Sequence, residues 1–162
     1  MRGYGKIAAW FRARPGALRL LVRLNHVLPL IFYYLYPLLL LQLAVRRESE
    51  RFLRVLLVPA AAFASCTILR HIFRAKRPYE SRGFVPLIPR EKTGDSFPSR
   101  HMTSAAVIAA AYWYVYPAVG AALAAAAACI AVVRVLAGVH FPRDVIAGGA
   151  LGLAFALVGF RP

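Results

Sequence analysis

Residues 119–144, VGAALAAAAACIAVVRVLAGVHFPRD, decide the fold. They begin with an apolar run close to the roughly 20 residues that cross the hydrocarbon core of a bilayer. The run carries Arg134 near its end and is followed by His140 and Asp144, the last acidic residue of the sequence. Ionisable side chains at membrane depth cost roughly 2.5 to 3.5 kcal/mol each even on permissive scales, so such a cluster indicates a functional site.

The composition of the whole sequence agrees with a membrane protein. Hydrophobic residues make up 60% of the 162 positions, more than a soluble domain usually carries. The formal net charge is +15, but the basic residues fall at the ends of apolar runs and in the central loop. Anionic lipid surfaces or phosphorylated substrates therefore fit better than nucleic acid. We predict one integral membrane domain over residues 1–162.

Five apolar segments have nearly spanning length and predict an all-α, polytopic membrane helical bundle of about five transmembrane helices. They are residues 27–45, 52–73, 101–117, 119–139 and 145–160. Residues 1–25 are too charged to span, and their aromatic and arginine residues, interrupted at Pro15, predict an interfacial amphipathic helix or a broken pair of helices. A partly ordered basic tail is the alternative. Residues 26–162 then form the transmembrane core.

Small residues are concentrated in the last two expected spans. The alanines of residues 121–128, together with Gly148 and Gly152, would let helices approach closely. Spacing alone leaves open whether these faces pack within one chain or in a homo-oligomer. Cys66 and Cys129 lie in apolar segments, without neighbours typical of metal or redox sites, and are interpreted as core residues. No removable signal peptide is expected, because no short apolar stretch precedes a cleavage site.

Five spans place the loop of residues 74–100 on the same side of the membrane as His140 and Asp144. Arg70 and Arg77 are seven residues apart, two helical turns, so a continuing helix would present both on one face. Guanidinium groups suit a phosphate. At the start of the third span Ser99 is expected to cap the helix, whose free N–H groups would face an anion beside Arg100 and His101. Arg134, near the end of the fourth span, needs an anion or a water-filled cavity as its neighbour.

His140 and Asp144 flank Pro142, which favours the first turn of a new helix. Asp144 can then accept a hydrogen bond from one ring nitrogen of His140, which leaves the other nitrogen basic, as nucleophilic catalysis requires. His101 is then free to protonate a leaving oxygen. A catalytic metal is not expected, because zinc sites usually take three or four well-spaced ligands and the nearby arginines would repel a cation.

Three motifs between Arg70 and Asp144, R-x6-R-P, P-S-R-H and R-x5-H-x3-D, resemble the signature of the type 2 phosphatidic acid phosphatase family. The resemblance implies a membrane enzyme that hydrolyses lipid phosphomonoesters or diphosphates through a phosphohistidine, with neither metal nor other cofactor. It implies that His140 is the nucleophile, Asp144 its orienting group and His101 the general acid. The implied phosphate-binding residues are Arg70, Arg77, Ser99 and Arg134. The departures from the family pattern are Arg70 in place of lysine, Arg100 in place of glycine and Val133 in place of serine.

Arg100 is the most consequential departure, because its side chain either binds a second phosphate or crowds the site. A preference for diphosphates is therefore a hypothesis. The candidate substrates are prenyl diphosphates such as undecaprenyl diphosphate, phosphatidylglycerol phosphate, phosphatidate and lipid A phosphates. A lipid phosphotransferase and a non-catalytic protein that binds or transports anionic lipid are the alternatives.

The resemblance also implies a site on the extracytoplasmic side of a bacterial cell membrane. Four arginines at the opposite end of the expected bundle agree with the excess of basic residues in cytoplasmic loops, and these are Arg46, Arg47, Arg51 and Arg54. The basic N-terminal segment argues against this orientation, because five spans place it on the same side as the site.

Overall fold

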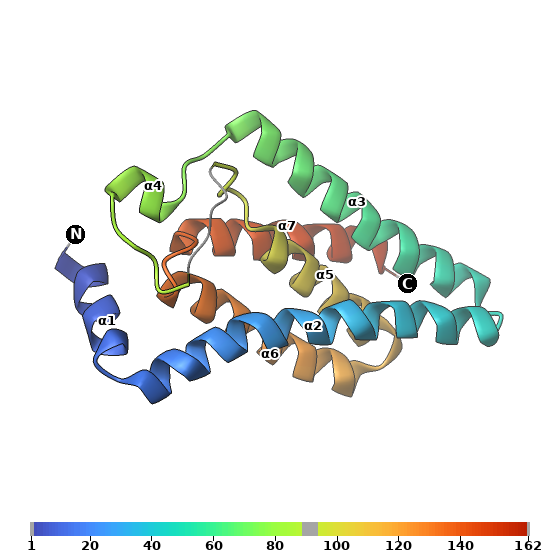
Figure 1. The fold of residues 1–162 in the computed structure, drawn as a ribbon. Helices are drawn as coiled ribbons and strands as arrows, with labels where there is room; N and C mark the ends of the chain where they lie inside the picture. Colours follow the sequence, from blue (N-terminus) through green and yellow to red (C-terminus); the bar gives the residue numbers. More distant parts are fainter. Residues whose placement is uncertain (1, 89–93, 162) are drawn as a thin grey trace.

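The computed structural model describes residues 2–88 and 94–161, and these residues form seven α-helices and no strand (Figure 1). The helices are α1 (Arg2–Arg12), α2 (Pro15–Val45), α3 (Ser49–Phe73), α4 (Pro78–Arg82), α5 (Arg100–Val115), α6 (Pro117–Leu136) and α7 (Pro142–Gly159). Four stretches are long and apolar enough to cross a membrane, namely α2, the α3–α4 stretch, α6 and α7. The predicted all-α membrane bundle is confirmed.

The third expected span, α5, is shorter than its neighbours. Its 16 residues extend about 24 Å at 1.5 Å per residue, less than the roughly 30 Å of a bilayer core. Half of these residues are buried, because α5 lies at the centre of the bundle in contact with α2, α3, α6 and α7. The surrounding helices cross the membrane, so α5 does not have to reach both surfaces.

The N-terminal segment is broken at Pro15, as the sequence suggested. The break separates α1 from α2, in which Pro15 is the first residue. However, α2 has 31 residues, about 46 Å, so it contains both the charged second half of the expected interfacial segment and the whole first span. The expected boundary at residue 25 falls inside this helix. The excess length lets the first turns of α2 project beyond the hydrocarbon core.

Helices α5 and α7 approach each other closely along two glycines. A Cβ added to Gly148 would lie 2.5 Å from the backbone oxygen of Ser99, and one added to Gly152 would lie 2.6 Å from that of Thr103. Real Cβ atoms need more room than this, so only glycine permits the observed packing. At these two positions the small residues serve packing within one chain.

Helices α1 and α4 lie at the same end of the bundle as the start of α7, whereas the α2–α3 connection and the C-terminus lie at the other (Figure 1). The predicted gathering of the polar segments on one side is therefore confirmed. Two neighbouring aromatic residues at the far end of α5 have different surroundings. Trp113 is 57% exposed, as an interfacial anchor should be, but Tyr112 is buried and its hydroxyl donates to the Leu35 carbonyl oxygen at 2.7 Å.

Candidate active site

Seven polar side chains are buried at the ends of helices or in the connections between them. α3 contributes Arg70 and α6 contributes Arg134 from their last turns, and α7 contributes Asp144 from its first turn. The remaining residues lie in the connections between helices. The members of this polar cluster are Arg70, Arg77, Ser96, Ser99, Arg134, His140 and Asp144. Buried polar and charged groups are costly unless they are paired, so the contacts of each one matter.

Asp144 and His140 face each other across a serine hydroxyl. The distance from His140 Nδ1 to Asp144 Oδ2 is 3.6 Å, which is long for a direct hydrogen bond. Ser96 Oγ lies 2.6 Å from the same Oδ2 and 3.4 Å from the same Nδ1. Since Ser96 donates to the carboxylate, its oxygen can accept only from a protonated Nδ1. This arrangement leaves Nε2 as the nitrogen with a lone pair.

Sequence reasoning missed Ser96. The only signal near it is that it comes two residues before the Pro98-Ser99-Arg100-His101 motif.

The start of α7 fixes the Asp144 carboxylate. Its Oδ2 also accepts the N–H of Phe141 at 2.9 Å, which satisfies one of the free donors at the helix N-terminus. The predicted helix start at Pro142 is confirmed. The backbone oxygen of Asp144 in turn accepts the Ser99 N–H at 2.9 Å, so the first turns of α5 and α7 are joined directly beside the cluster.

His140 is 3% exposed, and burial lowers the pKa of its imidazole below the ordinary value. The neighbouring Asp144 opposes this effect, whereas Arg77 and Arg134 add to it, because their positive charges disfavour an imidazolium. The neutral form of His140 is thus favoured at neutral pH. A neutral imidazole is the form that can act as a nucleophile.

The arginines of the cluster are held by backbone oxygens from several segments. Arg70 Nη1 donates to the Pro98 oxygen at 2.9 Å, and Arg77 Nε donates to the Gly94 oxygen at 3.1 Å. Arg77 Nη1 lies 3.4 Å from the oxygen of Val139, the residue before His140. Arg77 therefore lies beside the segment of the proposed nucleophile, and Arg70 lies close enough to Arg77 for their charges to interact. Arg77 directly precedes α4 and is not part of α3, so no continuous helix joins Arg70 to Arg77.

Ser99 precedes the first residue of α5, but its side chain does not cap the helix as expected. Its Oγ is buried and has no hydrogen-bond partner among the described residues.

Glu80, which sequence reasoning also missed, accepts the Arg77 N–H at 2.9 Å and the Gly94 N–H at 2.6 Å. The Glu80 carboxylate therefore ties the loop before α5 to α4 and sets the place of Arg77.

Arg100 and His101, in the first turn of α5, line an apolar cavity of about 450 Å³. The guanidinium carbon of Arg100 lies 5.3 Å from the ring centroid of Phe63, within cation–π range. The other lining side chains come mainly from α2 and α5, including Tyr33 and Ile108. The two predicted site residues thus lie where the polar end of the bundle opens into an apolar space.

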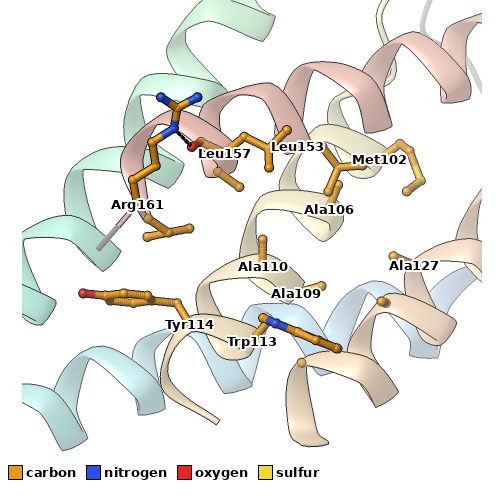
Figure 2. Close-up of a pocket in the computed structure, with 14 residues that line it drawn as sticks. Met102, Ala106, Ala109, Ala110, Trp113, Tyr114, Ala127, Leu153, Leu157 and Arg161 are labelled. Carbon is orange, nitrogen blue, oxygen red and sulfur yellow. Dashed lines mark hydrogen bonds between the residues drawn. The ribbon is translucent and has the colours of Figure 1, made fainter. Parts of the chain in front are cut away.

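A larger cavity, of about 560 Å³, lies between α5, α6 and α7, and Figure 2 shows its side chains. It extends from Met102 to Arg161 and is lined mostly by alanine and leucine. None of its lining residues belongs to the polar cluster. The smaller cavity is lined by none of the cluster residues either, but two predicted site residues, Arg100 and His101, lie in its wall.

A family model, the PAP2 superfamily, matches residues 51–161. The chain belongs to this superfamily. The matched region contains every residue of the polar cluster. It begins within α3, so it leaves out α1 and α2.

Two curated relatives and two solved structures agree with PAP2 membership. Proteins named lipid A 1-phosphatase from Rhizobium johnstonii and Rhizobium etli are each 41% identical over 64 residues, 40% of this chain. The match spans only 26% and 28% of those relatives.

The crystal structure of Aquifex aeolicus LpxE has a TM-score of 0.64 and 26% identity, covering 88% of this chain and 93% of that one. A PAP2-type phosphatidylglycerolphosphate phosphatase from Bacillus subtilis has a TM-score of 0.61 and 24% identity, covering 95% and 82%. The likeness to the Bacillus protein concerns the fold alone.

Proposed function

We propose that this protein is an integral membrane lipid phosphatase that hydrolyses a phosphomonoester or diphosphate through a phosphohistidine formed on His140. The observation that carries the proposal is the buried imidazole of His140, oriented through Ser96 toward Asp144 and placed beside Arg77. Such a group can attack phosphorus while guanidinium groups stabilise the charge on the phosphoryl oxygens. Membership of the PAP2 superfamily supports the same reaction.

The reaction would take two steps. His140 Nε2 attacks phosphorus, the bond from phosphorus to the lipid oxygen breaks, and His101 in its protonated form gives its proton to that oxygen. Water then attacks the phosphohistidine, gives a proton to the now neutral His101, and inorganic phosphate leaves with His140 restored. Transfer to a second lipid instead of water is the alternative outcome, and an assay with and without an acceptor lipid distinguishes the two.

The apolar cavity at His101 supports a lipid as the substrate. The leaving oxygen belongs to the lipid, so the general acid must stand between the phosphate site and the apolar chains. His101 fits this requirement because it lies two residues after the buried Ser99, in the first turn of α5, and also lines the cavity. Chains of a bilayer lipid could occupy that cavity by apolar contact.

The names of the Rhizobium relatives make lipid A the first substrate to test. Purified protein in detergent would be assayed for phosphate release from lipid A, phosphatidylglycerol phosphate, phosphatidate and undecaprenyl diphosphate, with and without a chelator. We expect release from at least one of them that survives the chelator. Release that is lost with the chelator and restored by a metal would contradict the metal-free scheme, and no release from any lipid would favour the non-catalytic alternative.

The acid limb of the pH profile should report His140. Because its pKa is lowered, the nucleophile stays neutral down to a pH below the ordinary imidazole value of about 6.5. Activity should therefore be lost only as the pH falls through that lowered pKa. The measurement is kcat/KM against pH, which reports the free enzyme. A phosphorus NMR titration of the lipid distinguishes ionisation of the substrate phosphate from ionisation of His140. An acid limb whose apparent pKa lies at or above the ordinary imidazole value would contradict the prediction.

Replacing Arg100 with glycine should weaken diphosphate turnover more than monophosphate turnover. The guanidinium lies at the mouth of the apolar cavity and close enough to Arg70 for the two charges to interact. A second phosphate there would gain a charge-assisted hydrogen bond, and we expect a loss of about tenfold in kcat/KM for the diphosphate. Arg74→Gly is the matched control, since it removes an exposed charge at the same end and its φ of 42° suits glycine. Equal effects on both substrates would refute the preference.

We further propose that the site faces the extracytoplasmic side of a bacterial cell membrane. Four arginines in and after the α2–α3 connection lie at the opposite end of the bundle, which agrees with the positive-inside tendency, and they are Arg46, Arg47, Arg51 and Arg54. The basic α1 lies at the site end (Figure 1). Labelling of tags on each terminus in intact cells would test the orientation: an inaccessible N-terminus would contradict it.

A further inference from the structure

Helix α1 is attached by one face to the loop that follows α4. The rings of Tyr4 and Phe84 are in contact, with centroids 4.3 Å apart. Arg12 Nη2 donates to the Val85 oxygen at 2.9 Å. Between these two contacts along the helix, Ala8 is 4% exposed and packs in an apolar cluster with Leu21 and Leu87. The face of α1 that carries Tyr4 is therefore fixed to the site end of the bundle.

The same face reaches the turn that carries His140. Gly138 has a φ of +75°, and a Cβ at this position would overlap the Tyr4 hydroxyl and lie 3.0 Å from Phe84 Cε2. The Tyr4 hydroxyl oxygen is buried and lies beside the backbone of Leu87. Leu87 itself donates its N–H to the Ala137 oxygen at 3.1 Å. The loop after α4 and the Tyr4 ring thus cover the outer side of the turn.

The inner side of the turn is held by groups of the polar cluster. The Arg134 backbone oxygen lies 3.3 Å from the Val139 nitrogen and 3.4 Å from the His140 nitrogen. Arg77 Nη1 approaches the Val139 oxygen. These contacts are longer than the hydrogen bonds of Ala137 and Gly138 earlier in the turn, so Val139 and His140 are its least firmly held residues. Packing of Tyr4 and Phe84 against Gly138 restricts the movement of the turn from the outer side.

We propose that Tyr4 is a positioning residue for His140: its ring, carried by α1, holds Gly138 in place and thereby fixes the proposed nucleophile against Arg77 and Arg134. The proposal rests on the proposed function, because His140 has to be positioned for attack only if it is the nucleophile. Tyr4 touches neither the phosphate nor the reacting atoms. Its effect should therefore appear in kcat rather than in KM.

The first test compares Tyr4→Ala with Tyr4→Phe in the full chain, with lipid A as the substrate. Removal of the ring should lower kcat by about tenfold to a hundredfold, because a shift of about 1 Å at a reacting group has effects of this size. KM should change by less than about threefold. Phenylalanine keeps the ring and should restore most of the rate. Trp10→Ala is the control on the opposite, exposed face of α1, and it should leave kcat unchanged.

Hydrogen exchange provides a readout that does not depend on activity. In Tyr4→Ala the backbone amides of residues 137–141 should exchange at least about tenfold faster than in the original protein, while those of α5 and α7 keep their rates. Unchanged exchange at these amides, or faster exchange throughout the bundle, would overturn the positioning role. If the original protein releases no phosphate from lipid A, exchange alone decides the proposal, so its failure and the failure of the proposed function are distinguishable.

A double substitution tests the contact itself. Gly138→Ala should lower kcat strongly in the original background, because the new Cβ meets the Tyr4 hydroxyl and the φ is unfavourable. In the Tyr4→Ala background it should cost at least about threefold less, since the overlap with Tyr4 is gone and only the φ effect and the contact with Phe84 remain. Gly83→Ala is the matched control: its φ is +61° and nothing lies within 4 Å of the added Cβ. Additive effects of Tyr4→Ala and Gly138→Ala would overturn the proposal.

Discussion

Replacing His140 with alanine is expected to lower phosphate release by about 10⁴-fold or more, because the chain loses the nitrogen that we propose forms the bond to phosphorus. The arginines and Ser99 stay in place, so binding of the lipid phosphate should be retained. The measurement combines a phosphate-release assay with a binding titration on the same preparation. His71→Ala is the matched control, since this histidine is exposed on α3 and lies outside the polar cluster.

The same variant tests the covalent intermediate. Rapid quenching of the original protein with radiolabelled lipid should give a protein-bound phosphate that is stable in base and labile in acid, as a phosphoramidate is. His140→Ala should give none. If the variant still forms the labelled species, or keeps the rate of the original protein, the nucleophile has been misassigned. If the original protein binds lipid but never releases phosphate, the non-catalytic alternative prevails.

Replacing Asp144 with asparagine should lower kcat by about a hundredfold to ten-thousandfold, the range seen when a buried carboxylate that orients a catalytic histidine is neutralised. Asp144 is fully buried, and one of its oxygens receives both the Ser96 hydroxyl and the Phe141 N–H. Asparagine can keep one acceptor oxygen but no longer stabilises positive charge that develops on His140. The measurement is kcat, together with thermal unfolding to show that α7 still forms.

Ser96→Ala separates orientation from charge in the same network. The carboxylate remains, but the hydroxyl between it and the imidazole is lost, and we expect a fall in kcat of about tenfold, equivalent to a net hydrogen bond of roughly 1.4 kcal/mol. Glu50→Gln, an exposed carboxylate at the other end of the bundle, should have no effect. A Ser96→Ala rate equal to the original would mean that Asp144 acts on His140 without the serine.

The helices were predictable because a bilayer imposes a minimum length on a spanning segment, and the motif residues because ionisable side chains at membrane depth are costly and rare. The continuation of the helix that begins at Pro15 into the first span was not predictable. Arg19 and Arg23 are exposed, so the charges that exclude this stretch from the hydrocarbon core do not end the helix. Continuing a helix costs less than starting a new one, and hydropathy does not register that difference.

The site was only partly predictable for a similar reason. Arginine, histidine and aspartate are conspicuous in apolar sequence, whereas Ser96 is one small polar residue in a polar loop, and its partner Asp144 comes 48 residues later. Tyr112 shows the same limit, because its hydroxyl finds a backbone oxygen on α2 that no spacing within α5 indicates. The assigned roles of the cluster residues stay predictions until the variants are measured.

The close seam between α5 and α7 has a mechanical consequence. Backbone meets backbone at Gly148 and Gly152, and the Ser99 N–H is bonded to Asp144 across the same seam, so these two helices should move as one body. A lipid headgroup cannot enter between these two helices without disrupting the geometry of the proposed active site. The movement that admits and releases lipids should therefore be a movement of α2, whose aromatic and proline residues form the opposite wall of the cavity at His101. The rate at which lipid enters and leaves the cavity should therefore depend on the movement of α2.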